Sequence, residues 1–133
     1  MRFLAAAILF LSLALIHAAS LSPSAYESHQ SKAPEHLEIQ VLLAEINPSD
    51  DAADTFAVRA EGRVEKVHRS QSGVKEGDII VITYSVKESS TGQPARGEIP
   101  FLAEGEQRVA YLENTGKPLE FRPAAAAMSF DNF

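Results

Sequence analysis

Apolar residues recur at every second position through much of this chain, which is the period of a half-buried β-strand. The segments "LEIQVLL" (residues 37–43) and "FAVRAEGRV" (residues 56–64) both show this alternation. Gly, Pro, Asn and Ser residues separate such runs and mark turns between them. The pattern predicts an all-β fold, with strands over residues 37–47, 55–67, 79–86, 108–112 and 119–122.

The second of these strands is long and changes phase along its length. Its apolar positions slip from Val64 to Val67, a step that a β-bulge absorbs by bending the strand. Gly62 lies just before the bend, where a missing side chain permits close approach of a neighbouring backbone. A long, bent strand favours a curled sheet, so we expect a small barrel of about five or six strands.

Two similar steps, "EGD" at residues 76–78 and "EGE" at residues 104–106, each stand directly before a predicted strand. Gly77 and Gly105 supply the positive φ that such chain reversals require. The carboxylates of Asp78, Glu104 and Glu106 then keep the turns solvated. We therefore expect these steps to be strand entries rather than a catalytic carboxylate pair, which needs an apolar pocket to raise one pKa.

The first residues have the pattern of a cleaved signal helix. Arg2 precedes an apolar run over residues 3–16, and "AAS" at residues 18–20 offers the small residues that signal peptidase reads. A membrane anchor is the alternative, but a bilayer span needs about 20 apolar residues. We expect a signal peptide over residues 1–20, cleaved after Ser20 or after Ala18. The mature chain would then be secreted or periplasmic and free of the membrane.

The remaining residues are enough for one domain. Residues 21–35 are rich in Ser, Pro and Ala without an apolar period, so they predict a flexible leader. Residues 36–123 hold the predicted strands and form the β-barrel domain, and residues 124–133 form a C-terminal tail. The chain has no Cys, so the barrel must be held by its core without disulfides. This favours a bacterial envelope protein over an animal extracellular module.

The charge of the chain limits its partners. Removing Arg2 from the 12 Lys and Arg residues leaves 11 against 18 Asp and Glu, a net charge of about −7 at pH 7. Such a chain repels the phosphates of nucleic acids and anionic lipid headgroups. The basic residues of segment 66–75 are flanked by Glu65 and Glu76 and form no uninterrupted patch.

Motifs for cofactor, metal or nucleophile chemistry are missing from the sequence. His29 and His36 lie in or beside the leader, far along the chain from His68, and no His-Glu-x-x-His motif occurs. There is no Gly-x-Ser-x-Gly elbow and no Gly-rich phosphate loop. We expect no cofactor, no metal site and no catalytic residue.

The segments "FAVRAEGRVEKVHRSQSGVKEGDIIVITY" (residues 56–84) and "PFLAEGEQRVAYL" (residues 100–112) are separated by a loop rich in Gly and Pro. In this order, residues 55–123 resemble the netrin-like modules and the related tissue inhibitors of metalloproteinases. The resemblance implies a five-stranded, OB-like Greek-key barrel that works by protein contact. The family's zinc-chelating amino-terminal cysteine and its disulfides have no counterpart here. We expect Tyr84 and Tyr111, like the three glycines of the bend and turns, to be structural.

Segment 87–100 holds too many Gly, Pro and Ser residues for a strand and predicts a long surface loop, where binding sites tend to lie. Arg96 and Phe101 are of the types that dominate binding hot spots, and Glu98 lies between them. We expect a non-catalytic binding module that contacts a protein or glycan through this loop and a barrel face. The alternative is a small secreted hydrolase whose carboxylates converge after folding: Asp78, Glu98, Glu104 and Glu106.

Overall fold

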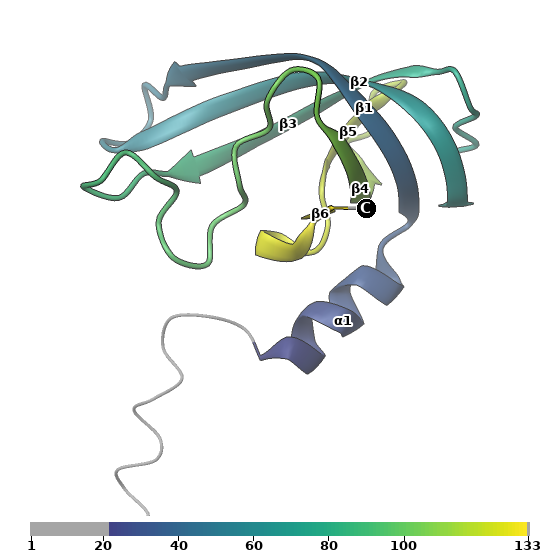
Figure 1. Cartoon of the computed structure of the whole chain (residues 1–133), viewed down its shortest axis with the longest axis horizontal. Helices are drawn as coiled ribbons and strands as arrows, with labels where there is room; N and C mark the ends of the chain where they lie inside the picture. The colour runs from purple at the N-terminus through teal and green to yellow at the C-terminus, as the bar shows by residue number, and fades with distance from the viewer. Residues whose placement is uncertain (1–21, 133) are drawn as a thin grey trace, which may run out of the picture.

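The computed structural model describes residues 22–132, so the predicted signal peptide lies outside the described residues. Strands are the main secondary structure of the described chain, as the alternation of apolar residues predicts. In chain order the elements are α1 (Pro23–Lys32), β1 (Glu35–Pro48), β2 (Thr55–Ser70), β3 (Ile79–Lys87), β4 (Gln107–Asn114), β5 (Glu120–Pro123), the 3₁₀ turn η1 (Ala126–Met128) and β6 (Phe130–Asp131) (Figure 1).

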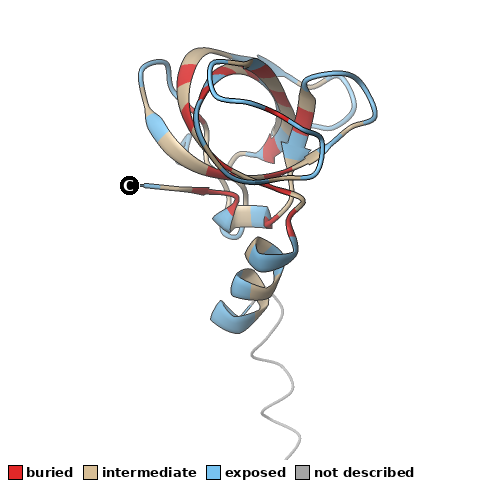
Figure 2. Cartoon of the chain, turned by 90° about the vertical axis from the view of Figure 1, so that its right-hand side faces the viewer, coloured by how far each residue is buried: buried red, intermediate tan, exposed pale blue. Residues whose placement is uncertain are grey.

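Five strands close into a barrel in the order β1-β2-β3-β5-β4, and pairing of β4 with β1 completes the ring. All neighbours are antiparallel except β3 and β5, which run parallel. The short strand β6 pairs with β4 outside the ring. Figure 2 looks through this ring and shows buried residues, in red, recurring along the strands that form it. The prediction of a small β-barrel is confirmed.

The core is built from the inward-facing residues of the alternating strands. Ile39, Ile82 and Phe121, on β1, β3 and β5, have no exposed surface and lie in one apolar cluster. Their neighbours along each strand face outward, because successive side chains of a strand point to opposite faces of the sheet. Burial of this apolar cluster is the main stabilising term for a chain without disulfides.

The phase slip in β2 is a β-bulge, as predicted. Ile39 pairs with Val64 while Glu38 pairs with Lys66, so Glu65 is an extra residue on β2. Two further irregularities in this pairing lie between His36 and Leu37 and between Val41 and Leu43 of β1. These bulges bend the long hairpin, and the first residues of β1 therefore reach β4 as well as β2.

Gly62 is buried beside this bend, but its closest neighbour differs from the expected one. A Cβ at this position would lie 3.4 Å from Cδ1 of Ile39 and 3.6 Å from the backbone oxygen of Gln40. A core side chain therefore approaches Gly62 more closely than a backbone does. The reason is that Gly62 faces the barrel interior, where Ile39 of the adjacent strand fills the space.

Residues 23–32 form helix α1, whereas the sequence predicts a flexible leader there. Ser22 caps the helix, because its Oγ accepts a hydrogen bond from the amide of Ala25 at 3.3 Å, and Pro23 starts the first turn. Gln30 then donates to the carbonyl of Met128 at 2.9 Å. No helix within residues 22–132 is long and apolar enough to cross a bilayer.

The predicted C-terminal tail packs against the barrel through its described residues. Ala125 and Ser129 have no exposed surface, and Phe130 is 4% exposed. The amide of Ala125 donates to Oγ of Ser129 at 2.9 Å, and the amide of Tyr111 donates to the carbonyl of Ser129 at 2.8 Å. The tail therefore covers the part of β4 that the short strand β5 leaves unpaired.

Candidate functional site

The two ends of the barrel present different chain segments (Figure 1). One end, here called the loop end, consists of residues 49–54 and 88–101, which meet where the amide of Glu88 donates to the carbonyl of Asp54 at 2.7 Å. The other, here called the turn end, consists of residues 71–78, residues 114–119 and the start of β1. Each end borders surface depressions that could hold a ligand.

Tyr84 fastens the long loop at the loop end to β3. Its hydroxyl donates to the carbonyl of Pro100 at 2.8 Å and accepts from the amide of Leu102 at 3.2 Å. Burial raises the pKa of Tyr84, so the hydroxyl keeps its proton at all physiological pH. Phe101 packs edge-to-face on Phe56 of β2, with ring centroids 6.2 Å apart. Residues 88–101 are therefore a fixed loop rather than a free one.

The three residues predicted to bind all lie on this loop. Arg96 is exposed, while Glu98 and Phe101 are half-buried. Among residues 22–132, neither Arg96 nor Glu98 takes part in an ion pair. A hairpin-like bridge between Glu88 and Pro94 shapes the first part of the loop. Arg96 is thus displayed to solvent on an anchored loop.

A shallow depression of about 410 Å³ lies on the outer face of β1, β2 and β3 beside this loop. Tyr84 lies on the strand beneath the depression, but its side chain packs against the core on the inner face of the sheet and holds the loop there. Arg59 lies 3.2 Å from Glu61 on the same strand and keeps 46% of its side chain exposed. Polar and apolar side chains both line it: Glu45, Asn47, Ala57, Val58, Arg59, Thr83, Tyr84 and Ser85.

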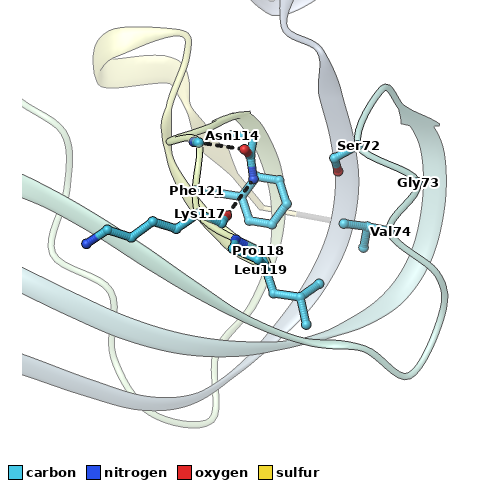
Figure 3. A pocket seen from close by; sticks show the side chains of 9 residues that line it. Ser72, Gly73, Val74, Asn114, Lys117, Pro118, Leu119 and Phe121 are labelled. Atoms are coloured by element: carbon cyan, nitrogen blue, oxygen red, sulfur yellow. Dashed lines mark hydrogen bonds between the residues drawn. The ribbon is translucent and has the colours of Figure 1, made fainter.

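At the turn end, a depression of about 450 Å³ lies between the two turns (Figure 3). Asn114 shapes one wall, because its Nδ2 donates to the carbonyl of Lys117 at 3.0 Å and its Oδ1 accepts from the amide of Gly116 at 2.8 Å. Leu119 is 44% exposed there and has a φ of 56°. A bulky residue in this left-handed conformation is uncommon.

Glu35, the first residue of β1, borders an adjoining depression of about 350 Å³. Its side chain has no exposed surface, and its Oε1 accepts a hydrogen bond from the amide of Ser72 at 2.9 Å. The sequence interpretation placed Glu35 in the leader and missed it. The signal was its phase: Glu35 alternates with Leu37 and Ile39 and so faces inward with them.

A row of stacked rings crosses the outer face of β2, β1 and β4. The ring of His36 lies 4.5 Å from His68 on one side and 4.5 Å from Tyr111 on the other. Nε2 of His68 lies 2.8 Å from Oε2 of Glu38. Burial lowers the pKa of His36, and the positive charges of His68 and Arg69 lower it further. Burial also raises the pKa of Tyr111.

The structure brings two of the three histidines together, but not into a metal site. His29 lies on α1, apart from the His36–His68 stack. Within residues 22–132, no group of three or more His, Cys, Asp or Glu side chains is arranged to hold a metal ion.

The four acids of the hydrolase alternative do not converge on one place, although Glu104 and Glu106 share the turn before β4. Asp78 accepts a hydrogen bond from an amide of its own turn at 2.9 Å, and Glu106 pairs with Arg108. Glu104 is exposed in the turn before β4. Asp78 precedes β3 and Glu98 follows it, so the length of that strand separates them. Gly77 and Gly105 have φ values of 88° and 87°, the conformation expected of strand-entry turns.

Comparison with protein-family models, with curated proteins and with solved structures finds no match to this chain. The likeness of residues 55–123 to netrin-like modules therefore has no support from a family match. The architecture itself is a small five-stranded barrel with mixed strand directions.

Proposed function

We propose that this chain is an exported, non-catalytic binding module with an OB-like Greek-key barrel. The strand order β1-β2-β3-β5-β4 and the parallel pairing of β3 with β5 support the OB-like assignment. Barrels of this type bind ligands on the face of their second and third strands and through adjacent loops. The signal-like pattern of residues 1–20 supports export.

The binding surface in this proposal is the loop end together with the depression on β1, β2 and β3. The observation that carries it is the double hydrogen bond of the Tyr84 hydroxyl, which orders the long loop at the same end of the barrel as that depression. A loop that is already ordered loses little conformational entropy when a partner binds. The surface is therefore prepared for contact before the partner arrives.

The chemistry of this surface favours a protein partner. Arg59 in the depression and Arg96 on the loop are both exposed, and arginine is enriched at the hot spots of protein interfaces. Tyr84 is the only aromatic residue among the lining residues, and its ring packs against the core on the opposite face of the sheet. The depression therefore offers hydrogen-bonding groups and no free aromatic platform for a sugar ring.

A matched pair of arginines on β2 tests this proposal. Arg59 and Arg63 each lie 3.2 Å from a glutamate two residues ahead, and their side chains are 46% and 44% exposed. Only Arg59 lines the depression. The immobilised protein would be incubated with an extract of secreted and periplasmic proteins and, separately, with purified cell-surface glycans. We expect one retained protein, lost in Arg59→Ala and in a Gly-Ser replacement of residues 89–97, and kept in Arg63→Ala.

Three results would contradict the proposal. Equal retention by all variants would show that the depression is not the contact surface. Retention of a glycan in place of a protein would reject the protein partner. Turnover of a retained molecule, abolished by changing Glu98 or Glu104, would restore the hydrolase alternative.

A further inference from the structure

Among residues 22–132, only one of the two side-chain oxygens of Glu35 has a hydrogen-bond partner. Its Oε1 accepts the amide hydrogen of Ser72 at 2.9 Å, while its Oε2, equally buried, has no hydrogen-bond partner among residues 22–132. A buried polar atom without a partner is uncommon in folded proteins, because it has lost water without gaining a protein donor. Such an atom at the border of a depression is expected to receive a donor from a ligand.

The surroundings of Glu35 favour a positively charged donor. Its depression is lined by no Lys or Arg, but by a second carboxylate, two amides, a hydroxyl and a proline: Pro34, Glu35, Gln71, Ser72, Glu113 and Asn114. Glu113 is already paired, with its Oε1 2.7 Å from Nε of Arg122. Lys117 points away from Ser72 and Val74 in Figure 3, and its side chain is 78% exposed. Glu35 is therefore a carboxyl group whose depression has no Lys or Arg in its lining.

The adjoining depression supplies apolar surface next to this charge. The two depressions share Ser72 and Asn114, so they adjoin each other. Val74, Leu119 and Phe121 line the second depression. Leu119 is held with a φ of 56° while its carbonyl accepts the amide of Val81 at 2.9 Å. Strained residues of this kind cluster at binding sites, where the surrounding structure enforces them.

We propose that the turn end binds an organic ammonium ligand with a short apolar substituent. The ammonium donates to Oε2 of Glu35, and the apolar part lies against Leu119 and Val74. The volumes of about 350 Å³ and 450 Å³ suit a small molecule or a single side chain. Gln71 and Ser72 are exposed loop residues at the rim of the depression that Glu35 borders. This site is separate from the surface of the proposed function.

The probe for this site is n-butylammonium, with 1-butanol and butyrate as neutral and anionic counterparts. Nitrogen-15 NMR of the purified protein would follow the amides of Ser72, Asn114 and Leu119 during each titration. We expect saturable shifts with n-butylammonium and none with the other two probes. Equal shifts with 1-butanol would overturn the proposal, because they would show apolar binding without the charge. Displacement of n-butylammonium by low concentrations of calcium would overturn it in favour of a metal site.

Glu35→Gln and Glu113→Gln form the matched pair of variants. Glutamine at position 35 keeps the oxygen that accepts from Ser72 and removes the charge, so we expect binding weaker by about tenfold or more. The carboxylate of Glu113 is already paired with Arg122, so Glu113→Gln should bind n-butylammonium as tightly as the wild type does. Unchanged binding in Glu35→Gln would overturn the proposal.

A second measurement keeps the test independent of the folding of Glu35→Gln. In wild-type protein with carbon-13-labelled glutamate, the Cδ resonance of Glu35 should move as n-butylammonium saturates the site. A Cδ resonance that stays in place would overturn the proposal. Because no loop-end residue enters this test, the proposed protein-binding function stands or falls separately.

Discussion

Replacement of Gly62 by valine tests how tightly the bend of β2 is packed. Gly62 is buried, pairs with Val41 of β1 and Ile80 of β3, and does not have a left-handed backbone. A Cβ at this position would lie 3.4 Å from Cδ1 of Ile39, at the limit of ordinary contact. Alanine therefore fits with little movement. Valine adds two further carbons where Ile39 already fills the space.

The expected cost follows from two opposing effects. Overpacking a core with extra carbons destabilises by about 1–3 kcal/mol. Replacing glycine also restricts the unfolded chain, which stabilises by about 0.4–1 kcal/mol. For Gly62→Val the net loss is about 1–2 kcal/mol, and for Gly62→Ala the two effects nearly cancel. At about 4–8 °C per kcal/mol, the valine variant should melt about 4–16 °C lower than the wild type.

Urea unfolding and thermal melting followed by circular dichroism would measure the series of glycine, alanine and valine. The slope of the urea transition should be the same in all three proteins, which would show that only stability has changed. A valine variant that melts within a degree or two of the wild type would refute the packing described for Gly62. An alanine variant as unstable as the valine variant would also refute it, because backbone contact would then be limiting.

Three further predictions concern single side chains. Tyr84→Phe removes the hydroxyl that bonds Pro100 and Leu102, so we expect the free energy of unfolding to fall by about 1–3 kcal/mol. Amide hydrogen exchange across residues 88–101 should also become faster, and unchanged exchange would show that Tyr84 does not anchor this loop. His36 has its folded pKa below the ordinary 6.5, so its contribution to stability is present above pH 6.5 and is lost as the pH falls through its folded pKa. Urea unfolding at about pH 8 and about pH 5 should show a smaller difference in His36→Gln than in the wild type. Leu119→Gly relieves a φ of 56° and should stabilise the barrel by about 1 kcal/mol in the same assay, whereas a loss of stability would show that Leu119 is not strained.

Much of the local structure could be predicted from the sequence. The two-residue period identified β1 and β2, an apolar run identified β3, and a turn between two short runs identified β4 and β5. The slip from Val64 to Val67 identified the bulge in β2. The positive φ of Gly77 and Gly105 also followed from their place before a strand. These features depend on residues that are close in the chain, so a short segment contains their cause. Helix α1 was missed although its cap, Ser22 before Pro23, is equally local.

The candidate sites depend on contacts between distant segments. The sequence shows neither that β4 returns to β1, nor that the Tyr84 hydroxyl meets a loop 16 residues later. It gave no reason to place Glu35 beside Ser72, which is 37 residues away. Closure of the barrel is decided by the summed pairing and burial of all the strands, and no single segment encodes it. The sequence by itself therefore determined the strands, the bend and the turns. The tertiary structure alone decided which polar groups are buried together, and hence where a ligand could bind.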